Sequence, residues 1–391
     1  MKTKEKFNQG ITLVALVITI IILLILLGIS ISALTQTGLF SRAKNAEQLS
    51  KEKQEEENTT LGRYENEIGK YLGENSEEIP SEPKEIKLVD KVNDGTIKIG
   101  DYVKYTPDVV TNTDKSYTDL ISNLGTYSGS ADNTTSTLAQ EINLNWRVLD
   151  VKDGQVRLIS DGPTTSKITL SGAKGYNNAV YLLDKTCNTL YNNTKLSSKV
   201  QNLKIEDIQE YLTYDYKQYK NDYVDTGKYG GTKTYTDNRY YPNLLAKEKT
   251  GWVDGKQGTE LDLNEQPTPI NETGTQAKTS ITVTQTYWYK STVEDDFKEQ
   301  KYYKLFVNNG TDYPIYWISS RCVYAHESHT TFRVRCIGSN SITAYNLYDS
   351  RNNQTPNNFA LRPVVTLNAD VQIDTANSGN GSTAELAYVI K

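Results

Sequence analysis

The segment WRVLDVKDGQVRLIS, residues 146–160, predicts the centre of the fold. Two short apolar runs, 146–151 and 155–160, are joined through Asp153-Gly154. Asp-Gly favours the tight two-residue turn that connects antiparallel strands. We therefore expect a β-hairpin here and an antiparallel sheet around it.

The rest of the C-terminal part of the chain predicts one helix, a loop region and further strands. Residues 197–219 have apolar side chains at roughly helical spacing, and Lys204-Ile205-Glu206-Asp207 is typical of a first helical turn. Residues 220–280 show little periodicity and predict long loops. Segments rich in β-branched and aromatic residues then predict strands at 313–324, 331–337, 342–348 and 360–367.

The N-terminal region differs from the rest of the chain. Residues 11–34 contain 19 apolar residues out of 24, and three lysines precede them. As a helix this run would span about 36 Å, enough for a hydrocarbon layer of about 30 Å. The sequence predicts a single-pass membrane protein with a cytoplasmic N-terminus. Its membrane anchor would include Ile11, Leu13, Ile20, Leu27 and Leu34.

The basic leader before Gly10, followed by Ile11-Thr12-Leu13-Val14, resembles the class III leader of type IV pilins and pseudopilins. The resemblance implies cleavage between Gly10 and Ile11 by a prepilin peptidase, methylation of the new N-terminus, and association with other pilin subunits. The chain has Ala15 where the family usually has Glu, which favours a minor pilin, a pseudopilin or a pilin-derived anchor. An uncleaved signal anchor remains the alternative, because insertion needs only an apolar span.

These patterns predict an α+β protein in which a long N-terminal transmembrane and stalk helix precedes a loop-rich, mainly antiparallel-sheet domain. The expected segments are a leader (1–10), a transmembrane helix (11–34), a helical stalk (35–72), a linker (73–86) and an exported surface domain (87–391).

Four short motifs of the exported domain resemble, in the same order, a domain of unknown function found on bacterial surface and phage-associated proteins. They are Trp146–Asp150, Ile205–Ile208, Tyr316–Arg321 and Leu361–Leu367. The resemblance implies a fold similar to C-type-lectin-like and formylglycine-generating-enzyme-like domains, with a variable binding region at 319–359. Activity does not carry over, because no catalytic motif is matched.

The candidate binding region has an unusual composition. Residues 319–363 hold five of the ten arginines, both histidines and no lysine. Tyr, Asn and Ser are mixed there as in antibody paratopes, where Tyr gives rigid contact area and Asn or Ser gives adaptable hydrogen bonds. The candidate ligand-binding residues are Arg321, Tyr324, His326, His329, Arg333, Arg335, Tyr345, Asn346, Tyr348, Arg351 and Asn352. The alternative is that these are ordinary polar positions on exposed strands and loops.

Little in the sequence indicates metal or catalytic chemistry. Cys322 and Cys336 flank a predicted hairpin centred near His329 and are candidate disulfide partners. Together with His326 and His329 they match no common zinc spacing, so we expect no metal and no cofactor. A net charge of −5 excludes a bulk electrostatic nucleic-acid binder, and we expect no nucleic-acid partner.

The predicted function is a pilin-like surface protein, an adhesin or minor pilin, whose exported domain binds an extracellular ligand or surface. We expect it not to be an enzyme, because no nucleophile is paired with a base. Two alternatives remain: a structural pseudopilin of a secretion or DNA-uptake machine, and a membrane-anchored surface enzyme.

Overall fold

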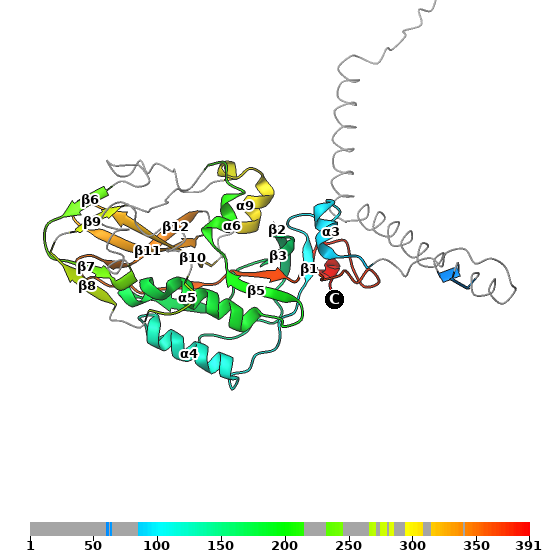
Figure 1. Ribbon diagram of the computed structural model, residues 1–391, viewed down its shortest axis with the longest axis horizontal. Coiled ribbons are helices and arrows are strands. Elements are labelled where there is room, and N and C mark those ends of the chain that lie inside the picture. Colours follow the sequence, from blue (N-terminus) through cyan, green and yellow to red (C-terminus); the bar gives the residue numbers. More distant parts are fainter. Residues whose placement is uncertain are drawn as a thin grey trace, which may run out of the picture.

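Two β-sheets and one long helix that packs against both form the centre of the described chain (Figure 1). The computed structural model describes residues 60–61, 63–64, 85–214, 232–244, 266–270, 274–279, 281–284, 294–307, 314–338 and 341–391.

The first sheet has six strands in the order β15-β1-β2-β3-β14-β5. All its pairs are antiparallel except β1 with β15. The strands are β1 (Tyr102–Lys104), β2 (Trp146–Lys152), β3 (Gln155–Ser160), β5 (Ser197–Asn202), β14 (Pro363–Leu367) and β15 (Tyr388–Val389). The predicted hairpin is confirmed as β2 and β3. Asp153 and Gly154 have φ angles of 52° and 75°, the positive values that this type of two-residue turn requires.

The second sheet has five strands in the order β12-β11-β10-β13-β4. Its strands are β4 (Lys167–Leu170), β10 (Tyr316–Ala325), β11 (Thr330–Ile337), β12 (Ile342–Asp349) and β13 (Asn357–Ala360). β10, β11 and β12 form an antiparallel meander, as the sequence predicts. Because β13 and β14 are consecutive but lie in different sheets, the chain crosses between the sheets at residues 361–362.

Three of the described strands lie within the region predicted as loops, 220–280, and a fourth follows it directly; together they form two small two-stranded sheets. They are formed by β6 (Thr232–Tyr235) with β9 (Ile281–Thr284), and by β7 (Arg239–Pro242) with β8 (Thr275–Lys278). These strands are short and contain many polar residues, so they show no recognisable alternation of apolar and polar side chains. Their partners are also far apart in the chain, and the sequence therefore did not predict these pairs.

The helices connect and cover the sheets. They are α3 (Leu88–Asn93), α4 (Lys115–Tyr127), α5 (Gly172–Tyr191), α6 (Ile205–Gln209) and α9 (Gln300–Phe306), with 3-10 turns η1 (Glu294–Asp296) and η2 (Ala384–Leu386). The predicted helix at 197–219 is only partly correct. Its first part is β5, and α6 begins at Ile205, where the backbone N–H of Lys204 donates to Asp207 (3.0 Å).

The helix α5 contacts strands of both main sheets, and α4 packs beside it. Its buried residues include Asn177 and Asn178. Two glycines permit the close approach of α4 and α5. A Cβ on Gly129, whose φ is +75°, would lie 2.0 Å from the carbonyl oxygen of Ser171, and one on Gly175 would lie 2.7 Å from that of Ser128.

The first sheet is buried on both faces, which explains why apolar residues adjoin one another along β2 and β3 instead of alternating strictly with polar ones. Val148 and Leu158 belong to the core shared with α5, whereas Leu149 and Ile159 belong to a second core. Phe306 of α9 also lies in that second core.

Buried arginines join these elements. The guanidinium of Arg157 on β3 lies between the carboxylates of Asp150 on β2 and Asp207 on α6, with an Nε–Oδ1 distance of 2.6 Å to Asp150. Burial by itself lowers the pKa of Arg157, but the hydrogen bonds and charges of the two carboxylates outweigh it and raise the pKa. Arg362 donates to the carbonyl oxygens of residues 160, 161 and 305, so it ties the first sheet to α9.

The predicted fold class is corrected by this arrangement. The described residues form a mixed α/β fold that is mostly sheet, and none of their helices is long and apolar enough to cross a membrane. Even α5, with 20 residues, carries Lys174, Asp184 and Lys185. The predicted leader, the membrane helix with Ile11, Leu13, Ile20, Leu27 and Leu34, most of the stalk and most of the linker lie outside the described residues. The described structure does not support a single-pass membrane protein, and we do not retain that prediction or the cell-surface location that depends on it.

Helix α3 and the C-terminus lie at the same side of the molecule (Figure 1). The backbone N–H of Ile373 donates to Ile86, and that of Gln372 donates to Lys391. The two-stranded sheets β6–β9 and β7–β8 lie at the opposite end, which we call the distal end (Figure 1).

Candidate functional site

Several predicted binding residues come together at the distal end. His326 and His329 lie in the turn between β10 and β11, with ring centroids 5.4 Å apart. The loop after β12 carries Arg351 and Asn352. It lies against this turn because the backbone N–H of Ser350 donates to the carbonyl oxygen of Thr330 (2.8 Å). Burial and the positive charge of Arg351 lower the pKa of His329, which favours its neutral form.

Most polar groups at this end are already bound within the protein. Arg351 pairs with Asp349 (2.9 Å), and Asn352 accepts a hydrogen bond from Tyr348 (2.8 Å). Ser328 lies within hydrogen-bond distance of both imidazoles. The described residues of the distal end therefore hold one another in place through their own contacts.

Other predicted binding residues are buried. Arg321 is fully buried and donates to the carbonyl oxygen of Asn177 on α5 (2.7 Å) and to Gln266 (2.8 Å). Arg335 is also buried and donates to the carbonyl oxygen of Arg321 (2.7 Å). Tyr348 belongs to the main core. The protein thus uses these side chains to connect its own segments, as it uses Arg157 and Arg362.

The remaining predicted residues lie on the strands of the second sheet. Arg333 on β11 stacks over the ring of Tyr324 on β10, with 5.2 Å between the guanidinium carbon and the ring centroid. Tyr345 on β12 is 38% exposed and packs edge-on against Phe359, and its neighbour Asn346 is half-buried. The predicted residues therefore do not form one continuous surface.

The predicted disulfide is not formed. Cys322 and Cys336 are buried free thiols on neighbouring strands. An irregularity between Trp317 and Arg321 shifts the register, so that Cys322 lies opposite Arg333 and Cys336 lies opposite Trp317. In the part of the chain that the structure describes, no three His, Cys, Asp or Glu side chains are grouped to hold a metal.

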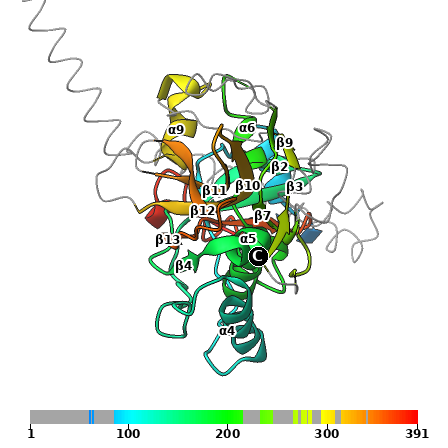
Figure 2. The same cartoon turned by 90° about the vertical axis from the view of Figure 1, so that its left-hand side faces the viewer.

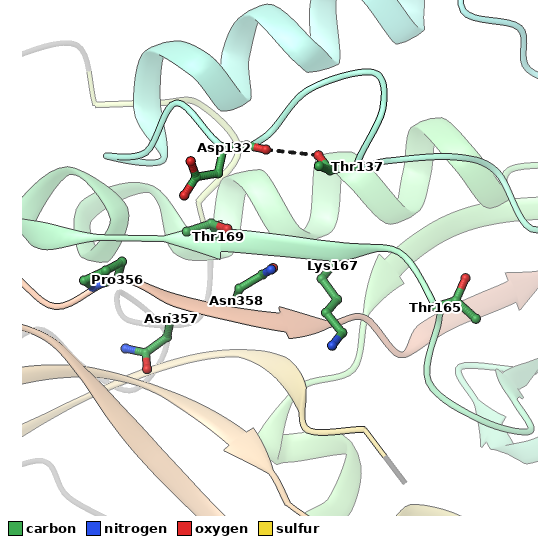
Figure 3. A pocket seen from close by; sticks show the side chains of 8 residues that line it. All are labelled: Asp132, Thr137, Thr165, Lys167, Thr169, Pro356, Asn357 and Asn358. Carbon is green, nitrogen blue, oxygen red and sulfur yellow. Dashed lines mark hydrogen bonds between the residues drawn. The ribbon is translucent and has the colours of Figure 1, made fainter. Parts of the chain in front are cut away.

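A cavity of about 530 Å³ opens on the surface of β4 and β13 (Figure 3). We call it the β4–β13 groove. Its described lining residues are Asp132, Thr137, Thr165, Lys167, Thr169, Pro356, Asn357 and Asn358. Figure 3 shows Asp132 and Thr137 on the loop that faces β4, Lys167 on β4, and Asn358 on β13. Three separate parts of the chain therefore build the groove.

The strands position one side of the groove. β4 is an edge strand, and Figure 2 shows it between β13 and α4. Asn358 pairs with Thr169 in the antiparallel register, and directly opposed residues place their side chains on the same face. Asn357 donates from its amide to the carbonyl oxygen of Asn346 on β12 (3.0 Å), which fixes the start of β13.

A buried asparagine fixes the loop on the other side. The side chain of Asn133 donates to the carbonyl oxygen of Thr169 (2.8 Å) and accepts from its N–H (2.8 Å), so it occupies the free edge of β4 as another strand would. Asn133 also donates to Ser128 (2.9 Å). Thr137 then donates to the carbonyl oxygen of Asp132 (3.1 Å), which closes the loop on itself.

The groove carries one charge of each sign. Among the described residues, neither Asp132 nor Lys167 forms an ion pair. Both side chains are exposed, and the carboxylate of Asp132 accepts a hydrogen bond from the hydroxyl of Ser130 through one of its two oxygens (3.0 Å). The arrangement can bind polar groups, whereas the described lining contains neither histidine nor cysteine.

The sequence analysis missed most of this site. Asn357 and Asn358 fall inside the predicted region 319–359, but they were not among the candidate residues. Asp132 and Thr169 lie in segments to which no function was assigned. A polar residue within a strand is a weak signal, since its neighbours across the sheet are known only once the strands are paired.

Comparison of the chain with protein-family models, with curated proteins and with solved structures gave no match. The resemblances to pilin leaders and to a lectin-like surface domain therefore stay predictions, and function has to be argued from the groove. Cleavage between Gly10 and Ile11 is tested by mass spectrometry of the mature N-terminus. An N-terminus still at Met1 would contradict it.

Proposed function

We propose that the domain formed by residues 85–391 is a ligand-recognition domain and that the β4–β13 groove is its binding site. One observation carries this proposal: a loop, an edge strand and β13 enclose a polar groove, and the buried side chain of Asn133 holds the loop in place. A site that is ordered before binding loses less entropy when it binds.

The chemistry of the groove favours binding over catalysis. A nucleophile needs a base within hydrogen-bond reach, and an acid and a base must act on the same ligand atoms. The two titratable groups of the described lining, Asp132 and Lys167, form no ion pair with each other, and the other polar groups are hydroxyls and amides. Such groups orient a ligand through hydrogen bonds.

The test uses the full chain immobilised on beads and a panel of macromolecules: mucin, peptidoglycan, collagen and fibronectin. Asp132→Ala and Asn358→Ala each remove one polar side chain from the groove. Asp90→Ala and Asn93→Ala are the matched controls, because both residues are exposed on α3.

We expect at least one macromolecule to bind, and each groove variant to weaken that binding about tenfold, the effect of losing about 1.4 kcal/mol of interaction. The control variants should bind like the natural chain. The proposal is wrong if no macromolecule binds, or if groove and control variants bind equally.

A further inference from the structure

Side chains that both donate and accept hydrogen bonds dominate the lining of the β4–β13 groove. They are the hydroxyls of Thr137, Thr165 and Thr169 and the amides of Asn357 and Asn358, of which Thr137 already donates within its loop and Asn357 already donates to Asn346. A sugar hydroxyl has the same double capacity, whereas a peptide backbone presents one donor and one acceptor per residue in a fixed order. This lining therefore matches a ligand with many hydroxyl groups.

The charges of the groove exclude ionic ligands. Asp132 and Lys167 cancel, so the lining has no net attraction for an anion or a cation. Apolar atoms, among them the ring of Pro356 and the methyl groups of the three threonines, form more of the exposed lining than polar atoms do, and the C–H faces of a sugar ring can pack against them. A carboxylate and an ammonium can each hold the hydroxyls of a neutral ligand through charge-assisted hydrogen bonds.

The groove has room for more than one ring. A second depression, of about 430 Å³, begins at Ala131, the neighbour of Asp132 on the same loop. Its described lining also contains hydroxyl and amide side chains, among them Ser130, Asn352 and Gln354. The two depressions share the loop 129–132 and the loop 352–358 as their borders. A chain of linked units can follow these two loops.

We infer that the β4–β13 groove binds an uncharged oligosaccharide. This inference rests on the proposed function and adds to it the chemical class of the ligand. Asp132 accepts hydrogen bonds from sugar hydroxyls on the loop side of the groove, Lys167 donates to them from β4, and Asn358 does both from β13.

The experiment is isothermal titration of the full chain with neutral hexasaccharides, namely maltohexaose, cellohexaose, xylohexaose and chitohexaose. A heparin hexasaccharide and a Gly-Ser decapeptide serve as the anionic and the peptide probe. The titrations are repeated with Asp132→Ala, Asn358→Ala and the controls Asp90→Ala and Asn93→Ala. Unchanged circular dichroism verifies that each variant is folded.

At least one neutral hexasaccharide should bind, and each groove variant should weaken it about tenfold or more while the controls do not. The inference fails if no neutral hexasaccharide binds, if only the heparin probe or the peptide binds, or if the groove variants leave sugar binding unchanged. Groove-dependent binding of a protein without sugar binding would overturn the ligand class and leave the proposed function standing. Absence of every kind of binding would overturn both.

Discussion

Replacement of Arg157 by Met should destabilise the protein strongly. The change removes the guanidinium that lies between Asp150 and Asp207 while retaining an unbranched side chain. The two carboxylate side chains it leaves behind are 10% and 4% exposed, so water cannot replace the lost partner. Removing one member of a buried ion pair costs about 3–5 kcal/mol, because the remaining charge stays buried without compensation.

The measurement is urea unfolding of the full chain, followed by circular dichroism and by the fluorescence of the buried tryptophans Trp146 and Trp317. With an m-value of about 2.5 kcal/mol per molar, a loss of about 3–5 kcal/mol lowers the midpoint by about 1–2 M. Lys115→Met is the matched control. Lys115 also pairs with a carboxylate, that of Asp119, but the two side chains are 86% and 50% exposed, and such pairs contribute at most about 1 kcal/mol.

A loss below about 1 kcal/mol for Arg157→Met, or a loss equal to that of Lys115→Met, would refute the reasoning. A second test uses Asp207→Asn alone and combined with Arg157→Met. Because Arg157 and Asp207 are in direct contact, the combined loss should differ from the sum of the single losses by about 1–3 kcal/mol. Simple additivity would show that the contact does not stabilise the fold.

Three further predictions follow from the buried contacts. Arg321→Met should lower the free energy of unfolding by about 2–4 kcal/mol, because carbonyl oxygens of α5 lose a charged donor; a stable variant that loses only ligand binding would contradict this. Gly175→Ala should lower it by about 1–3 kcal/mol, measured by thermal unfolding, since the new methyl would meet the backbone of Ser128 at 2.7 Å; an unchanged midpoint would show that the helices separate freely. Without reductant, the chain unfolded in urea should react with a thiol reagent at all three cysteines, and the native chain much more slowly; a single reactive thiol after unfolding would indicate that Cys322 and Cys336 are bonded.

Local chemistry was sufficient to predict the strands around tight turns. Asp153-Gly154 supplies the positive φ angles of a hairpin whatever surrounds it, and the flanking apolar runs become strands buried on both faces. The meander β10–β12 was predictable from its runs of β-branched and aromatic residues. By contrast, α5 was missed because Gly172, Gly175 and the adjacent asparagines are weak helix formers. Its stability comes from packing against both sheets.

In the candidate site, too, some features follow from the sequence and others only from the tertiary structure. The sequence by itself identified a polar, arginine-rich region, and composition alone made Arg321 and Arg335 appear to be surface residues. Only the tertiary structure decided that these two are buried and that Asp132, Thr169 and Asn358, far apart along the chain, line one groove. The physical reason is that a polar side chain satisfies its hydrogen bonds equally well with a ligand, with water or with a distant carbonyl oxygen, and the chain pattern is the same in all three cases.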